Sequence, residues 1–267
     1  MPGTERFVFA AGKQKGGLVL HLRLEEVDST NTYAKNNFRD LPDGSVVSAC
    51  RQTAGRGRVG RKWLSGEGLD ITASFLFKNI EKPFLAGAVT GISAIELLEE
   101  TVPGLSPFLK WPNDIYVQHF KLAGLLSEAV WEQGKMACIV CGIGLNVNSG
   151  KTLLSQAGQP AVSLFSLTEK QFDVKNLIER LVKIVNRYYI ICQQYPQEVF
   201  EKWRDCNRLI GHEIEVIDPS GKCMRGLFRD VDAEGTMIFE QNGQPMLFSC
   251  GDVKINAQSF GVTSRLK

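Results

Sequence analysis

Three arginines, one lysine and three glycines lie within the twelve residues QTAGRGRVGRKW, positions 52–63. The guanidinium groups of Arg56, Arg58 and Arg61 can form paired hydrogen bonds with carboxylate or phosphate groups. The glycines impose no fixed backbone shape, so such a loop can close over one anion, or over two anions that repel each other. Trp63 adds a flat surface on which a purine or another planar group can stack. The segment predicts an anion-binding loop, with a solvated basic turn as the alternative.

Two nucleotide-binding fingerprints are excluded by what surrounds their glycines. Gly55, Gly57 and Gly60 fit the pattern GxGxxG, but a dinucleotide site requires a helix after the glycine turn, and residues 69–77 have the alternation of a strand. The run from Gly150 to Thr152 ends like a phosphate-binding P-loop. That motif needs a glycine five residues before Gly150, where this chain has leucine, so a turn with a surface lysine is predicted instead.

Two further stretches place polar groups beside apolar strands. In LKWPNDIYV, residues 109–117, Pro112 removes a backbone donor and predicts a bend, where Asn113 and Asp114 present polar groups at the strand break. A simple β-turn is the alternative interpretation. In KLAGLLSE, residues 121–128, Lys121 stands at the start of an apolar strand, from which it can project into a cleft or into solvent.

The apolar periodicity predicts a mixed α/β domain followed by a small β module. The expected strands are at 17–27, 44–53, 69–77, 108–117 with a break, 121–131 and 135–147. The expected helices are one at 83–100, one capped by Asp173, one at 196–206 and a short one capped by Asp28, Ser29 or Thr30. After Asn207, turn residues recur at short intervals, which is typical of an all-β unit. The predicted domains are residues 1–206 and 207–267.

The composition is that of a soluble globular protein. The 267 residues are 43% hydrophobic and 22% charged, and the net charge of +2 gives no overall attraction for nucleic acid. No apolar run approaches the ~20 residues of a membrane span, and the N-terminus lacks a signal-peptide pattern, so a cytoplasmic protein with no membrane association is expected. Seven cysteines, an odd number, indicate reduced thiols. Cys138 and Cys141 would face opposite sides of one strand, which argues against a zinc site.

Taken together, these motifs resemble one family. The segments GRGRVGRKW, KWPNDIYV, KLAGLLSE and GIGLNVN, in this order after VDSTN at 27–31, are similar to those of the biotin–protein ligases, also called biotin–[acetyl-CoA-carboxylase] ligases or holocarboxylase synthetases. The resemblance covers roughly residues 20–260. A lipoyl- or octanoyl-protein ligase on the same fold is an alternative, although the lipoate ligases' arginine-serine-triple-glycine loop is absent. A more distant alternative is an RNA-binding protein using the arginine-glycine loop, which predicts more basic-aromatic clusters than the one found.

The resemblance implies a fold, a reaction and a set of partners. The fold is α+β, a mixed sheet with helices packed on it as in class II aminoacyl-tRNA synthetases, with a C-terminal SH3-like β-barrel. The family activates biotin with ATP and Mg²⁺ to biotinyl-5′-AMP and then transfers biotin to a lysine of a biotin carboxyl carrier domain. Because VDSTN begins at residue 27, no room is left for the DNA-binding domain of bifunctional members, so no DNA binding is expected. A homodimer is one of the oligomeric states the resemblance leaves open.

The resemblance also assigns roles to individual positions. The biotin site would contain Ser29, Thr30, Asn31, Gln52, Gly55, Arg56, Gly57, Arg58, Lys121 and Gly124. The nucleotide site would contain Arg58, Arg61, Trp63, Asn113 and Asn146. The catalytic groups would be Lys121, Arg58 and Asp114, with Asp114 orienting the reactants or helping to hold Mg²⁺. The chain departs from many relatives at Val59, where they carry another arginine, which leaves retention of the adenylate open.

The arginine-glycine loop is expected to become ordered when its ligands bind. Its glycines and like charges give it little reason to settle before an anion arrives. Biotin with ATP should therefore slow trypsin cleavage at Arg56, Arg58 and Arg61, measured by mass spectrometry of timed digests. Equal cleavage rates with and without the two ligands would contradict this expectation.

Overall fold

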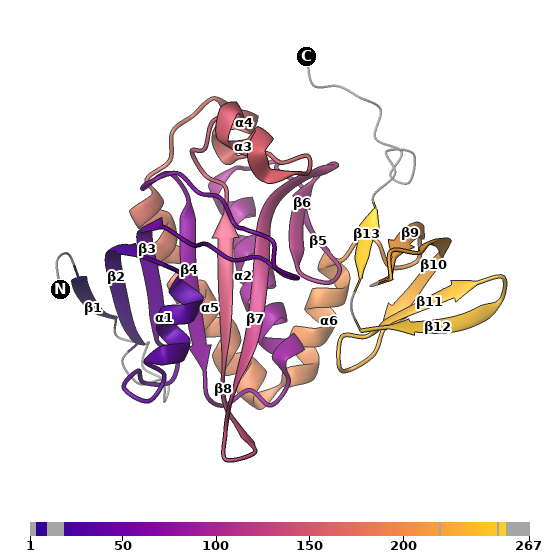
Figure 1. Cartoon of the computed structure of the whole chain (residues 1–267), viewed down its shortest axis with the longest axis horizontal. Coiled ribbons are helices and arrows are strands. Elements are labelled where there is room, and N and C mark those ends of the chain that lie inside the picture. The colour runs from indigo at the N-terminus through magenta and orange to yellow at the C-terminus, as the bar shows by residue number, and fades with distance from the viewer. Residues whose placement is uncertain (1–3, 10–18, 219, 250, 255–267) are drawn as a thin grey trace.

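A computed structural model describes residues 4–9, 19–218, 220–249 and 251–254. Its main feature is an eight-stranded sheet with the order β1-β2-β3-β4-β8-β7-β6-β5 (Figure 1). Only β2 and β3 pair in parallel among these strands; the other neighbours are antiparallel. The strands are β1 (Thr4–Phe9), β2 (Val19–Val27), β3 (Val46–Gln52), β4 (Ile71–Phe77), β5 (Pro107–Lys110), β6 (Asp114–Val117), β7 (Phe120–Glu132) and β8 (Lys135–Leu145). The mixed α+β class is confirmed.

Three helices cover one face of this sheet: α2 (Pro83–Thr101), α5 (Val174–Gln194) and α6 (Pro196–Cys206) (Figure 1). They form the larger core with alternate residues of the central strand β4, including Phe75 and Phe77. Leu76 belongs to a smaller cluster on the opposite face. The two cysteines of the CxxC run divide in the same way, since Cys141 lies in the larger core and Cys138 in the smaller cluster. The predicted divergence of their sulfurs is confirmed.

The opposite face is only partly covered, by the short helix α1 (Thr30–Asn36). Ser29 is its N-cap, one of the three candidates, and its hydroxyl accepts a hydrogen bond from the backbone N–H of Thr32. Helix α1 contacts β3, β4 and β8, and Ala34 is fully buried there. Because this helix has only seven residues, it leaves the β7 side of the face free for the loop between β3 and β4.

The segment after β8 contains short helices that the sequence did not predict. They are α3 (Lys151–Leu154), η1 (Ser155–Ala157) and α4 (Leu164–Thr168). Gly150 precedes α3 as its N-cap, and Lys151 is exposed, as expected for a surface lysine. Strand β1 was also not predicted. Residues 17–18 of the first predicted strand and Cys250 lie outside the described residues.

The C-terminal module is an antiparallel sheet with the order β12-β11-β10-β9-β13. Its strands are β9 (Glu213–Ile217), β10 (Cys223–Val231), β11 (Met237–Gln241), β12 (Gln244–Phe248) and β13 (Asp252–Lys254). The all-β character is as predicted. Pairing of β12 with β13, which would close a barrel, is not among the described strand pairs, so the SH3-like barrel stays a prediction. No helix in the described ranges is long and apolar enough to cross a membrane.

The module is attached to the main domain through shared core and polar contacts. Phe228 and Phe239 belong to the same core cluster as α2 and α5. Arg204 of α6 forms a bidentate salt bridge with Asp230 of β10. The indole N–H of Trp111, in the turn between β5 and β6, donates to the carbonyl oxygen of Gly235 at 2.9 Å. The KWPND turn is thereby fixed against the module.

Replacing this indole should reveal the strength of the attachment. Trp111→Phe keeps an aromatic ring but leaves the Gly235 carbonyl without its donor, which we expect to cost about 1–3 kcal/mol in the free energy of unfolding. Chemical denaturation measures the change. Trp131→Phe is the matched control, since that ring is 67% exposed. Equal stability of the two variants would show that the Trp111 bond contributes nothing.

Candidate active site

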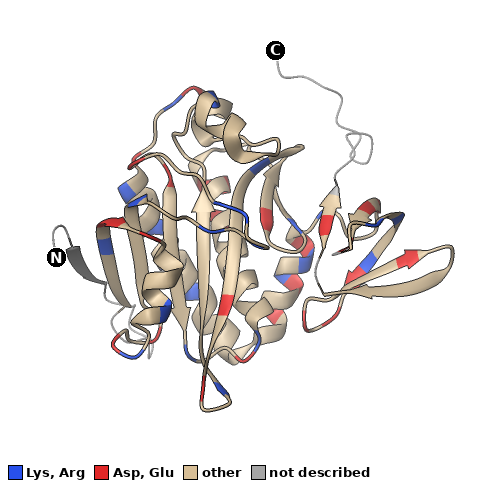
Figure 2. Ribbon diagram, viewed as in Figure 1, with Lys and Arg blue, Asp and Glu red and all other residues tan. Residues whose placement is uncertain are grey.

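A cavity of about 680 Å³ lies on the less covered face of the main sheet. Figure 1 shows the chain between β3 and β4 passing in front of the central strands, and Figure 2 shows basic positions along it. The region around α3 and residues of the C-terminal module complete the walls. The cavity brings together all the predicted site residues but one: Ser29, Thr30, Asn31, Gln52, Arg56, Gly57, Arg58, Arg61, Trp63, Asn113, Asp114, Lys121, Gly124 and Asn146.

Gly55 is the exception, because it does not line the cavity. Its carbonyl oxygen accepts a hydrogen bond from the backbone N–H of Trp63 at 3.0 Å, which closes the base of the loop. An added Cβ at Gly55 would lie 2.5 Å from the carbonyl oxygen of Trp63. Gly55 therefore shapes the base of the loop. Val59 is at the opposite extreme: it lies at the loop tip with a positive φ of 51° and is 89% exposed.

The floor of the cavity is made of glycines on two paired strands. Gly124 of β7 lies directly opposite Gly144 of β8. A Cβ at Gly144 would overlap the indole ring of Trp63, and one at Gly142 would overlap the amide of Asn31. Both side chains therefore rest directly on the backbone of β8. Gly142 and Gly144 were not predicted as site residues, although their spacing of two on a predicted strand places them on one face.

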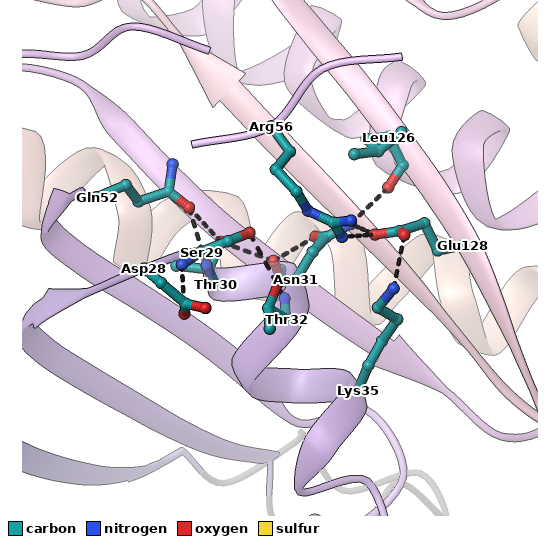
Figure 3. Close-up of polar contacts among 11 residues, drawn as sticks. Asp28, Ser29, Thr30, Asn31, Thr32, Lys35, Gln52, Arg56, Leu126 and Glu128 are labelled. Carbon is teal, nitrogen blue, oxygen red and sulfur yellow. Dashed lines mark hydrogen bonds and ion pairs between the residues drawn. The ribbon is translucent and has the colours of Figure 1, made fainter. Parts of the chain in front are cut away.

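One end of the cavity is a polar cluster at the start of α1 (Figure 3). The backbone N–H and the hydroxyl group of Thr30 both donate to Gln52 Oε1, at 2.8 and 3.1 Å. Ser74 of β4 places its hydroxyl oxygen 2.8 Å from Thr30 Oγ1 and 2.6 Å from Asn31 Oδ1. One hydrogen-bond network thus contains the predicted site residues Thr30, Asn31 and Gln52. Ser74 also belongs to this network, although the sequence did not predict it.

A carboxylate that sequence reasoning did not assign lies next to this cluster. Glu128, the last residue of KLAGLLSE, pairs with Arg56 at 2.5 Å and with Lys35 at 2.6 Å. Partial burial acts to raise the pKa of Glu128, but hydrogen bonds from Lys35, Asn31 and Arg56 outweigh it and leave the pKa below its usual value. The ionised carboxylate holds the first loop arginine near the polar end of the cavity (Figure 3).

The other end of the cavity contains two further cations. Lys121 forms an ion pair with Asp114 at 2.7 Å, and both side chains are largely buried. Its backbone is held from both sides, since Lys121 N–H donates to Pro160 O and Lys121 O accepts from Val162 N–H. The second cation, Arg58, donates to Asn113 Oδ1 at 3.0 Å. These groups come from the loop, the KWPND turn and the start of β7, as the sequence predicted.

The third loop arginine reaches the C-terminal module. Arg61 forms an ion pair with Asp252 of β13, a residue outside every predicted site motif. Asn146 is 5% exposed and donates through Nδ2 to Val162 O, so it positions the segment after η1 against the cavity. Within the described residues, no group of three or more His, Cys, Asp or Glu side chains could hold a metal ion.

Comparison with known proteins identifies the family. The Biotin/lipoate A/B protein ligase family matches residues 24–146. A biotin–[acetyl-CoA-carboxylase] ligase of Mycobacterium tuberculosis is 30% identical over 217 residues, which are 79% of this chain and 79% of that protein. The chain belongs to this family. The resemblance seen in the sequence is confirmed.

Other members of the biotin/lipoate ligase family match at similar levels. The bifunctional ligase/repressor BirA of Escherichia coli is 29% identical over 250 residues, covering 92% of this chain and 76% of BirA. Among solved structures, a biotin protein ligase of Aquifex aeolicus in complex with biotin and ATP superposes with a TM-score of 0.73 at 28% identity. That match covers 88% of this chain and 97% of the Aquifex protein.

The contact between Trp63 and the glycine floor gives a direct test of this arrangement. Gly144→Ala should push the indole off β8, shift the Trp63 fluorescence to the red and lower stability by about 1–3 kcal/mol, as overpacking typically does. Subtracting the spectrum of the same variant carrying Trp63→Phe isolates this ring. Gly150→Ala is the control, since nothing lies within 4 Å of an added Cβ there. An unshifted Trp63 spectrum in Gly144→Ala would contradict the contact.

Proposed function

We propose that this chain is a biotin–protein ligase, which activates biotin with ATP and transfers it to a lysine of a carboxyl carrier domain. The observation that carries the proposal is the single cavity that joins the arginine-glycine loop, Lys121 and the polar cluster of α1. Similar proteins are biotin–protein ligases by name, and the Aquifex structure is a complex with biotin and ATP.

In the first reaction, a carboxylate oxygen of biotin attacks the α-phosphorus of ATP. The new bond forms biotinyl-5′-AMP, and the bond from the α-phosphorus to the bridging oxygen breaks, so that pyrophosphate leaves with the electron pair. Two anions must meet, so cations held in place beforehand lower the barrier most. We assign this role to Arg58 and Lys121. Mg²⁺ would arrive bound to the phosphates of ATP, as part of the substrate.

The placement of biotin follows from the polar character of the two ends. Ser29, Thr30, Asn31 and Gln52 offer hydroxyl and amide groups that suit the neutral ureido ring. Gly57 and Gly124 leave room for the ligand, and Arg56 takes the carboxylate side. Trp63 would pack on the ligand, and its buried indole N–H has no acceptor among the described residues, so it is free to donate to a bound ligand.

The nucleotide would lie on the other side of the reacting centre. Arg61, Trp63, Asn113 and Asn146 are the proposed contacts, and all four line the cavity. Asp114 holds Lys121 in its present position, which supports an orienting role. The ammonium group of Lys121 has three N–H donors, so it can contact phosphate oxygens while Asp114 accepts one of its hydrogen bonds.

In the second reaction, the lysine amine of the acceptor attacks the acyl carbon of biotinyl-5′-AMP, and AMP leaves. Residues 1–206 would form the catalytic domain. Residues 207–267 would form an SH3-like domain that closes the cavity through Asp252 and its neighbours. Ile217, Asp218 and Val253 of this module line the cavity, which supports the assignment.

A biotin-dependent exchange of labelled pyrophosphate into ATP tests the proposed function. We expect exchange with biotin and none with lipoate or octanoate. Exchange supported by lipoate or octanoate in preference to biotin would establish the alternative ligase instead. No exchange with any of these acids, together with tight RNA binding, would overturn the assignment to an acid-activating enzyme.

The role of Lys121 can be separated from simple binding. Because Arg56 is proposed to move from Glu128 to the biotin carboxylate, Lys121→Ala should change biotin affinity by calorimetry only a little. The rate of single-turnover adenylate formation should fall on the order of 10²–10³-fold, as for the loss of one donor matched to developing charge. The control Lys135→Ala removes an exposed lysine at the start of β8. Equal losses of affinity and rate would make Lys121 only a binding residue.

A further inference from the structure

In the part of the chain that the structure describes, every hydrogen-bond partner of the Glu128 carboxylate is a donor. Its Oε1 accepts from Lys35 Nζ at 2.6 Å, and its Oε2 accepts from Arg56 Nη2 at 2.5 Å and from Asn31 Nδ2 at 2.9 Å (Figure 3). An ionised carboxylate is the only side-chain group of this size that accepts at both ends. The site is thus built for a glutamate and for no uncharged isostere.

The contacts of Asn31 fix which way its amide points. Its Nδ2 donates to Glu128 Oε2 and to Leu126 O at 3.0 Å, both of which can only accept. Its Oδ1 lies 2.6 Å from the hydroxyl group of Ser74, which can donate. Turning the amide over would place its oxygen against Leu126 O and Glu128 Oε2, two groups that can only accept. Both amide hydrogens are therefore used within the protein.

What remains for a ligand is the carbonyl oxygen of Asn31. An amide oxygen accepts two hydrogen bonds, and Ser74 supplies the one that is found among the described residues. Asn31 lines the cavity and rests against Gly142, where no Cβ intervenes. The residue can thus accept an N–H from a bound molecule and can donate none to it.

We propose that Glu128 is a positioning residue for biotin recognition, acting through Asn31. By occupying one amide hydrogen it holds the Asn31 oxygen toward the cavity, where it accepts an N–H of the ureido ring. This inference rests on the proposed function. It explains why Asn31 would favour a ring that donates an N–H.

The two cations serve different purposes in this arrangement. Lys35 lies on α1, one turn from Asn31, so it ties the carboxylate to the same helix. When Arg56 moves to a ligand, Lys35 still balances the charge of Glu128. The carboxylate therefore stays ionised, and the Asn31 amide stays oriented, whether the loop is docked on Glu128 or on the ligand.

Glu128→Gln tests the proposal because glutamine must turn its NH₂ group toward a donor. We expect the KM for biotin in pyrophosphate exchange to rise up to about tenfold, the upper end of the typical net contribution of a hydrogen bond between neutral groups, here the ureido N–H and the Asn31 oxygen. The kcat and the KM for ATP should stay within about twofold, since no ATP contact passes through Glu128. Glu128→Asp keeps an acceptor-only group and should recover part of the loss.

Glu132→Gln is the matched control. Glu132 lies four residues further along β7 and pairs with Arg39, in an exposed bridge outside the cavity. The same chemical change there should leave the KM for biotin unaltered. An equal rise in both variants would show that the effect comes from the charge of the strand and would overturn the proposal.

A double-mutant cycle decides whether Glu128 acts through Asn31. In an Asn31→Ala background, Glu128→Gln should change the KM for biotin by less than about twofold. If Glu128→Gln raises the KM by the same factor in the Asn31→Ala background as in wild type, the proposal is wrong. If that rise disappears only in an Arg56→Ala background, Glu128 acts through the loop and not through Asn31. If wild type shows no biotin-dependent exchange, it is the proposed function that fails.

A ligand-side measurement covers the case in which Asn31→Ala does not fold. Biotin analogues methylated at either ureido nitrogen lack one N–H each. Glu128→Gln should weaken binding of biotin, measured by calorimetry, but should have little effect on the analogue that lacks the hydrogen accepted by Asn31. Equal weakening of biotin and both analogues would overturn the proposal.

Discussion

The arrangement of the site depends on the close approach of two side chains to the backbone of β8. Asn31 and Trp63 rest where Gly142 and Gly144 have no Cβ atoms, and Gly124 continues this bare surface onto β7. A side chain at either β8 position would lift α1 or the loop away from the sheet. The three glycines thus set the depth of the cavity, and the polar contacts around it are possible only at that depth.

Four of the cations that line the cavity already have acceptors before any ligand is considered. Arg56 is docked on Glu128, Arg58 on Asn113, Arg61 on Asp252 and Lys121 on Asp114. The free energy that an anionic ligand gains from these cations is only the difference between its own contacts with them and the contacts that it replaces. Because each contact with a ligand replaces a contact within the protein, the affinity for the ligand in its ground state is limited.

The sequence predicted most strands and the longer helices because their alternation and caps are local. It also brought the cavity residues together through motifs, from Ser29 to Asn146. The short helices at 151–168 were not predicted because they are too short to show an apolar periodicity. They are held by tertiary contacts, such as that of Asn146 with Val162. Asp252 could not be found, since nothing near it in sequence marks its pairing with Arg61. Glu128 belongs to a recognised motif on β7, but its partners lie on helix α1 and on the arginine-glycine loop, which are far from it in sequence.

The contact between β13 and the arginine loop also affects when the cavity can be completed during synthesis. The cavity is assembled from residues that extend from Ser29 at the start of α1 to Asp252 in the last described strand. During synthesis the main sheet emerges from the ribosome before this strand does, and domains generally fold in that order. The partner of Arg61 is therefore among the last groups to arrive, so a nascent chain holds an incomplete cavity until nearly all of these residues have emerged.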